Sequence, residues 1–93
     1  MKPFVNISFP EEQTQAYRCP CCGYLTLHGR GGYEICTVCF WEDDGQDDHD
    51  ADEIRGGPNK DFSLTMARDN FKKIGVWHPQ YRDNVRAPLP HEL

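Results

Sequence analysis

The sequence predicts a small α+β domain in which a pair of β-hairpins packs against one C-terminal amphipathic helix. Its 93 residues form a single domain, residues 1–93, with room for only a thin hydrophobic core. All five cysteines lie in two short runs, at 19–22 and 36–39, and helical periodicity is confined to residues 63–75. Because so short a chain needs a staple in addition to its core, we expect a zinc-stapled fold with zinc-ribbon-like hairpins.

Four of the five cysteines have the spacing of a metal site. Cys19 with Cys22 and Cys36 with Cys39 form two C-x2-C pairs, which are separated by thirteen residues. Two tight turns at this spacing present four thiolates to one tetrahedral zinc ion. The sequence therefore predicts Zn²⁺ as the cofactor, in a closed site that stabilises the structure and leaves no position for a reacting water.

Cys21 is the fifth cysteine and lies inside the first turn. We interpret it as a spare thiol, with an exchangeable ligand or a redox sensor as the alternative. The odd number of cysteines excludes a fully paired disulfide framework. Thioredoxin-like chemistry would need a strand that leads into a helix at the C-x2-C motif, and neither pair has that setting.

The first 42 residues are expected to hold the β-structure. Val5, Ile7 and Phe9 alternate with polar residues, so residues 1–15 form either an N-terminal strand or a tail. Residues 16–42 are predicted to form the zinc-ribbon hairpins, with short strands on either side of each cysteine turn. A glycine follows the first C-x2-C pair, where a positive φ angle lets backbone amides turn toward the sulfurs.

Residues 43–59 are predicted to form a long acidic loop on the surface, which ends in turn-forming residues. Eight carboxylates and no lysine or arginine fall between Glu42 and Glu53, while ten basic and seven acidic residues elsewhere leave a charge of +3. A solvated loop and a docking surface for a basic partner protein are both open interpretations. A calcium loop is a third, but Glu53 and Asn59 stand where its glycine and glutamate belong.

The candidate partner-binding residues come from the start of this loop and the tryptophan before it. They are Trp41, Glu42, Asp43, Asp44, Asp47, Asp48 and Asp50. The tryptophan has an alternative position in the core, packed against the helix. Tyr81, from the C-terminal region, is a further possible contact.

Residues 63–75 are predicted to form the helix, capped by Ser63 and stopped by Gly75. Its apolar stripe recurs at three and four residues and consists of Leu64, Ala67, Phe71 and Ile74. We expect the stripe to rest on the aromatic residues of the hairpins, Tyr24, Tyr33, Phe40 and Trp41. Residues 76–93 contain three prolines and are predicted to be an extended C-terminal tail.

Several functional classes are disfavoured by what the sequence lacks. No apolar run is long enough for a secretory signal or a membrane span, so we expect a cytoplasmic protein. No phosphate-binding loop, nucleophile motif or acid/base pair is visible, and we therefore expect no enzyme.

The sequence resembles the bacterial cysteine-rich CPCC family. The resemblance is carried by Cys-Pro-Cys-Cys-Gly-Tyr at 19–24, Ile-Cys-Thr-Val-Cys-Phe-Trp-Glu-Asp-Asp-Gly at 35–45 and Gly-Gly-Pro-Asn at 56–59. Two positions depart from the family pattern: Thr37 stands where proline is frequent, and Met66 stands where an acidic residue would complete a capping box with Ser63. The resemblance implies a zinc-ribbon-like domain, and analogy with small bacterial families implies an immunity protein that neutralises a toxin.

Two functional hypotheses follow. The first is a non-enzymatic zinc-binding protein-interaction module whose acidic loop binds a basic partner protein, for which a nuclease-type toxin is the model. The second is a nucleic-acid-binding or regulatory adaptor protein of the zinc-ribbon type, which would use the basic residues Arg68, Lys72, Lys73, Arg82 and Arg86.

Overall fold

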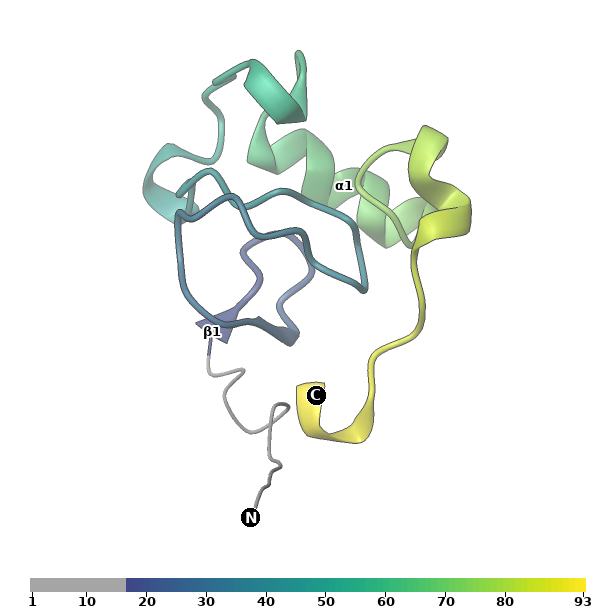
Figure 1. Ribbon diagram of the computed structural model, residues 1–93. Helices are drawn as coiled ribbons and strands as arrows, with labels where there is room; N and C mark the ends of the chain where they lie inside the picture. The colour runs from purple at the N-terminus through teal and green to yellow at the C-terminus, as the bar shows by residue number, and fades with distance from the viewer. Residues whose placement is uncertain (1–16) are drawn as a thin grey trace.

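The computed structural model describes residues 17–93, so the strand or tail expected for residues 1–15 lies outside the described residues. In chain order the elements are strands β1 (Tyr17–Arg18) and β2 (Leu25–Leu27), 3-10 helices η3 (Asp48–Asp50) and η4 (Gly57–Asn59), helix α1 (Leu64–Ile74), and 3-10 helices η5 (Pro79–Asn84) and η6 (Pro90–Glu92). Figure 1 shows the cysteine-containing loops in front of α1, with the C-terminal segment running down one side of the molecule.

The first predicted hairpin is present. β1 and β2 pair in antiparallel fashion, with Tyr17 opposite Leu27 and Arg18 opposite Leu25. The pairing is irregular between the two residues of β1, and the hairpin is closed by a 2.9 Å bond from the Cys19 N–H to the Tyr24 carbonyl. The strands are this short because the chain must turn at once to place the first cysteine pair.

The second predicted hairpin is reduced to an isolated bridge between Ile35 and Glu42. The expected strands contain Tyr33 and Phe40, whose φ angles of 62° and 71° lie in the left-handed region. A strand needs extended dihedrals at successive residues, so a regular ladder cannot pass through either position. Within residues 17–93 the fold therefore has one hairpin, and the second cysteine pair lies on a loop.

Helix α1 begins and ends as the sequence predicts. The Ser63 hydroxyl accepts a 3.1 Å hydrogen bond from the Met66 N–H, which caps the first turn. Gly75 has a φ of 79° and donates to the Phe71 carbonyl at 2.9 Å, so the helix ends in a left-handed cap. Leu64 and Ala67 are fully buried and Phe71 packs against the core, whereas Ile74, the last residue of the predicted stripe, is 38% exposed.

Two tryptophans form the centre of the core. The rings of Trp41 and Trp77 meet edge to face with centroids 5.3 Å apart, and Phe62 meets Trp77 in the same way at 5.5 Å. Of the aromatic residues expected to cover the helix, Tyr24 contacts Phe71. Tyr33 does not belong to this layer, since it is 56% exposed.

The C-terminal residues are not an extended tail. Val76 and Trp77 are buried, and η5 and η6 each begin at a proline, whose fixed φ suits the first position of a helix. The Arg86 guanidinium binds both oxygens of the buried Glu92 carboxylate at 2.8 Å and donates to the Thr37 hydroxyl at 2.8 Å. The segment is thus fastened to the loop that carries the second cysteine pair.

Candidate metal centre

The four cysteines predicted as ligands come together in one cluster. The sulfurs of Cys19, Cys22, Cys36 and Cys39 all lie within 4.8 Å of one another. Cys19 and Cys39 have their sulfurs 3.6 Å apart, as do Cys22 and Cys36. Four sulfurs placed about 2.3 Å from one tetrahedral ion would be separated by about 3.8 Å, so the donor set and its spacing fit a metal ion.

The two cysteine turns have the same backbone pattern. In the first, the Cys19 N–H donates to the Tyr24 carbonyl and the Gly23 N–H donates to the Cys19 carbonyl, at 2.9 and 2.8 Å. In the second, the Cys36 N–H donates to the Trp41 carbonyl and the Phe40 N–H to the Cys36 carbonyl, at the same two distances. We call each of these turns a cysteine knuckle, first (19–24) and second (36–41).

The position after each C-x2-C pair has a positive φ angle, which is 84° at Gly23 and 71° at Phe40. Glycine adopts this conformation without steric cost, whereas a side chain makes it unfavourable by roughly 1 kcal/mol. Phe40 is held there by packing, because its ring lies 4.8 Å from that of Tyr81. The second knuckle is therefore fixed by aromatic contacts where the first is fixed by glycine.

Cys36 receives more hydrogen bonds than a simple ligand needs. The Thr26 hydroxyl donates to its sulfur at 3.0 Å, and the Val38 and Cys39 N–H groups point to it at 3.4 and 3.5 Å. Donors of this kind stabilise a thiolate and orient it toward a metal. Thr26 comes from β2, so the first hairpin supplies an outer contact to a ligand of the second knuckle.

These contacts divide the four thiols electrostatically. Hydrogen bonds from the Cys19, Cys22 and Cys39 thiols, with a contribution from Thr26, hold the pKa of Cys36 below its ordinary value. Burial raises the pKa of Cys39. Binding of a metal ion to such a cluster releases the protons that its thiols carry.

Cys21 borders this group, since its side chain contacts Cys39, but it is not one of the four clustered cysteines. It is buried, with 7% of its surface exposed, and lies in the core beside the cluster without belonging to it. All five cysteines are free thiols. The four clustered cysteines are thus the two C-x2-C pairs, and the additional thiol of the first knuckle lies in the core beside them.

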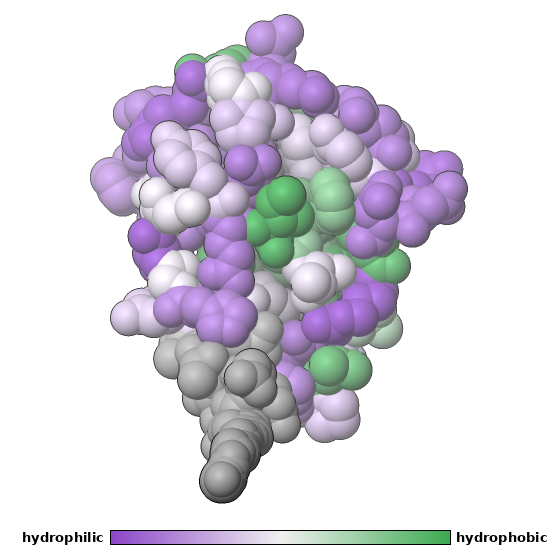
Figure 2. Space-filling view, viewed as in Figure 1, coloured by the Kyte–Doolittle hydropathy of each residue, from purple (hydrophilic) through white to green (hydrophobic). Residues whose placement is uncertain are grey.

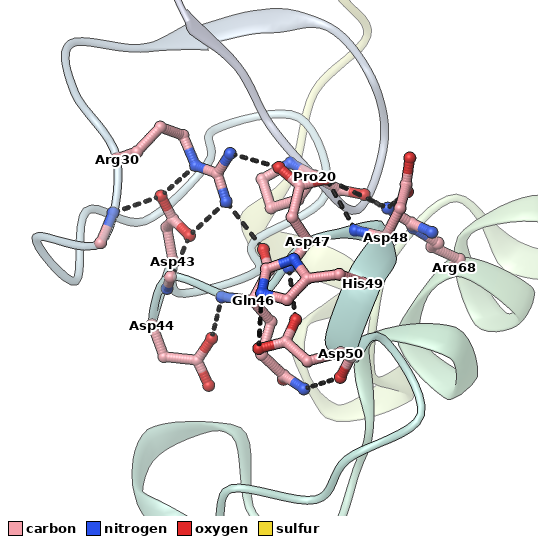
Figure 3. Close-up of polar contacts among 12 residues, drawn as sticks. Pro20, Arg30, Asp43, Asp44, Gln46, Asp47, Asp48, His49, Asp50 and Arg68 are labelled. Carbon is pink, nitrogen blue, oxygen red and sulfur yellow. Dashed lines mark hydrogen bonds and ion pairs between the residues drawn. The ribbon is translucent and has the colours of Figure 1, made fainter.

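The acidic stretch is folded around Arg30 instead of extending into solvent. Figure 3 shows the Arg30 guanidinium facing Asp43 and Asp47. Its Nε donates to Asp43 at 2.8 Å, its Nη1 to Asp47 at 2.7 Å, and its Nη2 to the Gln46 carbonyl at 2.7 Å. The Asp43 carboxylate is fully buried and also accepts from the Gly31 and Gly45 N–H groups.

Asp50 is a second buried carboxylate of this stretch. It accepts from the Asp47 N–H at 2.8 Å and forms an ion pair with Arg55, while Asp47 caps η3 in return. The buried Gln46 amide donates to the carbonyls of Asp50 and Glu53, at 2.9 and 2.8 Å. These bonds give residues 43–53 a defined conformation.

Arg68 joins α1 to both the acidic stretch and the first knuckle. Its Nε donates to the Pro20 carbonyl at 2.8 Å, and its Nη2 binds Asp48 at 2.7 Å (Figure 3). Sequence reasoning did not find this role, or that of Arg30, because the partners are distant along the chain. The signal available was a concentration of eight carboxylates that some cation had to balance.

The predicted partner-binding residues separate into two groups. Trp41, Asp43 and Asp50 are buried, so they do not face a partner and instead support the fold. The side chains of Asp47 and Asp48 are 44% and 86% exposed, and Glu42 and Asp44 are half-buried. The three aspartates of the calcium-like pattern bind different groups, namely Arg68, Arg55 and the Thr65 hydroxyl, so they do not converge on one point.

Fold and cysteine geometry together define a small α+β domain built on a four-cysteine cluster. The family model described as Cysteine-rich CPCC matches residues 17–92. The chain therefore belongs to the cysteine-rich CPCC family, as its sequence motifs predict. Neither the curated proteins nor the solved structures include a match to this chain. In residues 17–93, no helix has the length and apolar character needed to cross a membrane.

Proposed function

We propose that the four-cysteine cluster binds one Zn²⁺ ion and that the chain is a non-enzymatic protein-interaction module. An all-cysteine set of four favours zinc, and it leaves the ion no coordination position for a substrate. The 3.6 Å sulfur separations and the hydrogen-bond donors around Cys36 support a structural role for this ion. The site would hold the two knuckles together at the base of the acidic stretch.

The zinc proposal predicts different behaviour for two cysteine substitutions. Cys36→Ser removes a ligand and should reduce bound zinc well below one ion per chain, with loss of folded structure. Cys21→Ser, its control in the neighbouring core, should retain one zinc. Native mass spectrometry with circular dichroism measures both, and a Cys36→Ser protein that keeps a full zinc complement would overturn the assignment.

The second part of the proposal concerns a surface that we call the acidic face, formed by Asp44, Asp47, Asp48, Asp52 and Glu53. The eight carboxylates between Glu42 and Glu53, balanced by Arg30, Arg55 and Arg68, leave a charge of −5 there (−8 plus 3). The side chains of Asp48 and Glu53 are 86% and 64% exposed. Concentrated charge of one sign attracts a partner of the opposite sign.

The observation that carries this proposal is the fixed conformation of the acidic face. The buried Asp43, Gln46 and Asp50 anchor its backbone from within, so its exposed carboxylates are held in place before a partner arrives. A surface organised in advance loses less entropy on binding than a free loop. This favours a specific interaction surface over a merely solubilising loop.

The partner proposed is a basic protein, with a nuclease-type toxin as the model, and the chain would act as its immunity protein. Nucleases that bind a phosphate backbone carry clustered positive charge, which complements the acidic face. The alternative, nucleic-acid binding, receives less support. Arg68 and Arg86 are engaged with Asp48 and Glu92, and the acidic face would repel phosphate.

A charge-matched pair of variants tests the acidic face. The triple variant Asp44→Asn, Asp48→Asn and Glu53→Gln should bind a basic nuclease-type toxin at least tenfold more weakly than the native chain does, with a shallower salt dependence. The control carries Asp61→Asn, Asp69→Asn and Asp83→Asn, three exposed positions outside the acidic face, and should bind as the native chain does.

Equal affinities of the two triple variants would contradict the proposal. A fluorescence anisotropy titration with short RNA and DNA at low salt distinguishes the protein-interaction module from the nucleic-acid-binding alternative. If the chain is a protein-interaction module, it should bind neither nucleic acid. Retention of nucleic acid that is lost on Lys72→Ala and Lys73→Ala would favour the nucleic-acid-binding adaptor instead.

A further inference from the structure

An apolar groove of about 360 Å³ opens between the second knuckle, the end of α1 and the C-terminal segment. Its walls are almost entirely apolar and come from Val38 of the knuckle, from Phe71 and Gly75 at the end of α1, and from residues 85–88. Figure 2 shows hydrophobic residues at the surface in the middle of this view and beside the C-terminal segment, among hydrophilic neighbours. Exposed apolar surface of this kind favours an occupant with apolar side chains.

Two cations border this groove. Residues three apart are neighbours on the surface of a helix, so Lys72 lies beside Gly75 at the end of α1. Arg82 belongs to η5 and precedes Val85 by three residues, which is one turn of a 3-10 helix. Both side chains are exposed, and among residues 17–93 neither is paired with a carboxylate. The groove therefore favours an apolar side chain that has carboxylates beside it.

The chain carries a side chain of this kind at the edge of the acidic face. Ile54 is 58% exposed, although isoleucine is usually buried. It directly follows Asp52 and Glu53, which are both exposed. Arg55 pairs with Glu53, yet residues 50–55 keep a net charge of −2, from three carboxylates and one guanidinium. Ile54 and its neighbours thus have the chemistry that the groove favours.

Ile54 cannot fill the groove of its own chain. It forms a β-bridge with Ser63, the residue that caps the start of α1. The groove lies at the other end of the helix, and the axis from Ser63 to Gly75 is about 18 Å long. The exposed isoleucine of one chain can therefore meet only the groove of another.

We propose that the chain self-associates head to tail, with Ile54 of one copy seated in the groove of a second copy. The carboxylates beside Ile54 would then face Lys72 and Arg82 of the second copy. The contact is small and copies with a net charge of −5 repel one another, so the association is weak and occurs in concentrated solution. It does not depend on the basic partner proposed above, although such a partner on the acidic face would compete with it.

The test mixes two variants of the full zinc-loaded chain, each with one half of the contact removed. Ile54→Ser removes the inserted side chain, and Ala87→Glu adds a larger, negatively charged side chain to the groove at an exposed position. Each variant alone should sediment as a monomer at concentrations where the native chain associates. An equimolar mixture should form a 1:1 pair and nothing larger, because one member keeps the groove and the other keeps Ile54. Analytical ultracentrifugation measures these states.

The matched control is Ile35→Ser, which makes the same change at another exposed isoleucine and should associate as the native chain does. In the native chain, the methyl NMR signals of Val38 and Val85 should shift as the protein concentration rises. Raising the salt from about 50 mM to about 500 mM should weaken the association roughly tenfold, because exposed charges are then screened.

A native chain that stays monomeric at about 1 mM would overturn the proposal. A mixture that does not pair, although the methyl signals of the buried Leu64 show both variants to be folded, would overturn it as well. Groove signals that do not change with concentration would mean that no second copy occupies the groove. The acidic-face test above uses dilute protein, so either proposal can fail without the other.

Discussion

At the residue scale, the sulfur of Cys36 is the most heavily supported atom of the cluster. It accepts from a hydroxyl of β2 and from two amides of its own knuckle. The hydroxyl belongs to Thr26, so a substitution at that residue removes this contact without changing the four cysteine ligands. The contribution of an outer contact to metal affinity can therefore be measured separately from that of the ligands.

Thr26→Val is expected to weaken metal binding by about tenfold, within the range typical for outer contacts of a metal site. Valine has the same shape but cannot donate to the Cys36 sulfur, and Thr26 is buried at 2% exposure, so water cannot replace the hydroxyl. Competition with a chromogenic zinc chelator measures the change. Thr65→Val is the control, because Thr65 bonds to Asp52 and does not contact the cluster; an equal loss in both variants would refute the role of Thr26.

At the element scale, the acidic stretch depends on a buried ion pair. Asp43 is fully buried, and the Arg30 side chain opposite it is 28% exposed. Removing the charge from one member of such a pair leaves the other without its partner in a poorly solvated place. The carboxylate also accepts from two glycine amides, so it organises the turn as well as balancing the charge.

Asp43→Asn should therefore destabilise the fold by about 2–3 kcal/mol, somewhat less than the loss of a fully buried pair because asparagine retains one acceptor oxygen. Urea unfolding monitored by tryptophan fluorescence measures the free energy. Asp61→Asn, an exposed position, is the control and should change it by less than about 0.5 kcal/mol. Similar stabilities for the two variants would show that residues 43–47 do not depend on Arg30.

The C-terminal segment is held by the pair of Arg86 and Glu92. The Arg86 guanidinium holds the pKa of the Glu92 carboxyl below its ordinary value. A lowered pKa in the folded state stabilises the fold at pH values above the ordinary one, about 4.3, and that contribution is lost as the pH falls through the folded value. The fastening of the segment should therefore weaken in acid.

Glu92→Gln should lower the free energy of unfolding by about 1–2 kcal/mol at pH 7, a modest value because the Arg86 side chain is 38% exposed. The difference from the native chain should shrink below about pH 4, where the native carboxyl is itself protonated. Parallel urea titrations at several pH values measure it. A difference that stays constant down to about pH 3 would contradict the assignment.

Elements with local signals were predictable from the sequence. Ser63 and Gly75 mark the ends of α1 through bonds that span three or four residues, and the C-x2-C pairs specify their own turns. The second hairpin was not predictable in this way, because Tyr33 and Phe40 adopt left-handed dihedrals. This conformation is unfavourable for residues with a side chain unless tertiary packing stabilises it.

Long-range partners account for most of the other differences. Trp77 lies in a proline-containing region that predicts a surface segment, yet its backbone N–H donates to the Cys39 carbonyl and its ring packs on Trp41. Arg30 lies in a glycine-rich connector, where it has no periodic relation to Asp43 thirteen residues later. Such contacts depend on how the loops are brought together, and the cysteine cluster determines that.

At the scale of the whole molecule, the four-cysteine cluster joins two knuckles that lie on separate loops. The described residues contain one short hairpin and one helix of eleven residues, with long loops between them. Arg30, the second knuckle and Asp43 lie in consecutive loops, so the acidic face depends on the position of the second knuckle. The fold and the acidic face should therefore be lost together when the metal is removed.

Removal of the proposed zinc ion by a strong chelator should unfold the chain, because the ion's binding energy, on the order of 10 kcal/mol in small zinc domains, appears as folding energy. The buried Trp41 and Trp77 provide the fluorescence signal, which should change in step with zinc release and recover when zinc is added back. Magnesium at the same concentration is the control and should not restore it. A metal-free chain with native tryptophan fluorescence would show that the core is sufficient alone.

The matching backbone of the two knuckles has a consequence for the order of assembly. Each knuckle is closed by hydrogen bonds between residues four or five apart, so it can form in microseconds or less, ahead of any distant contact. The slow event would then be the meeting of two finished halves, each bringing two sulfurs, followed by arrival of Trp77 at the Cys39 carbonyl. A nascent chain could thus hold both half-sites ready before the residues that complete its core have left the ribosome.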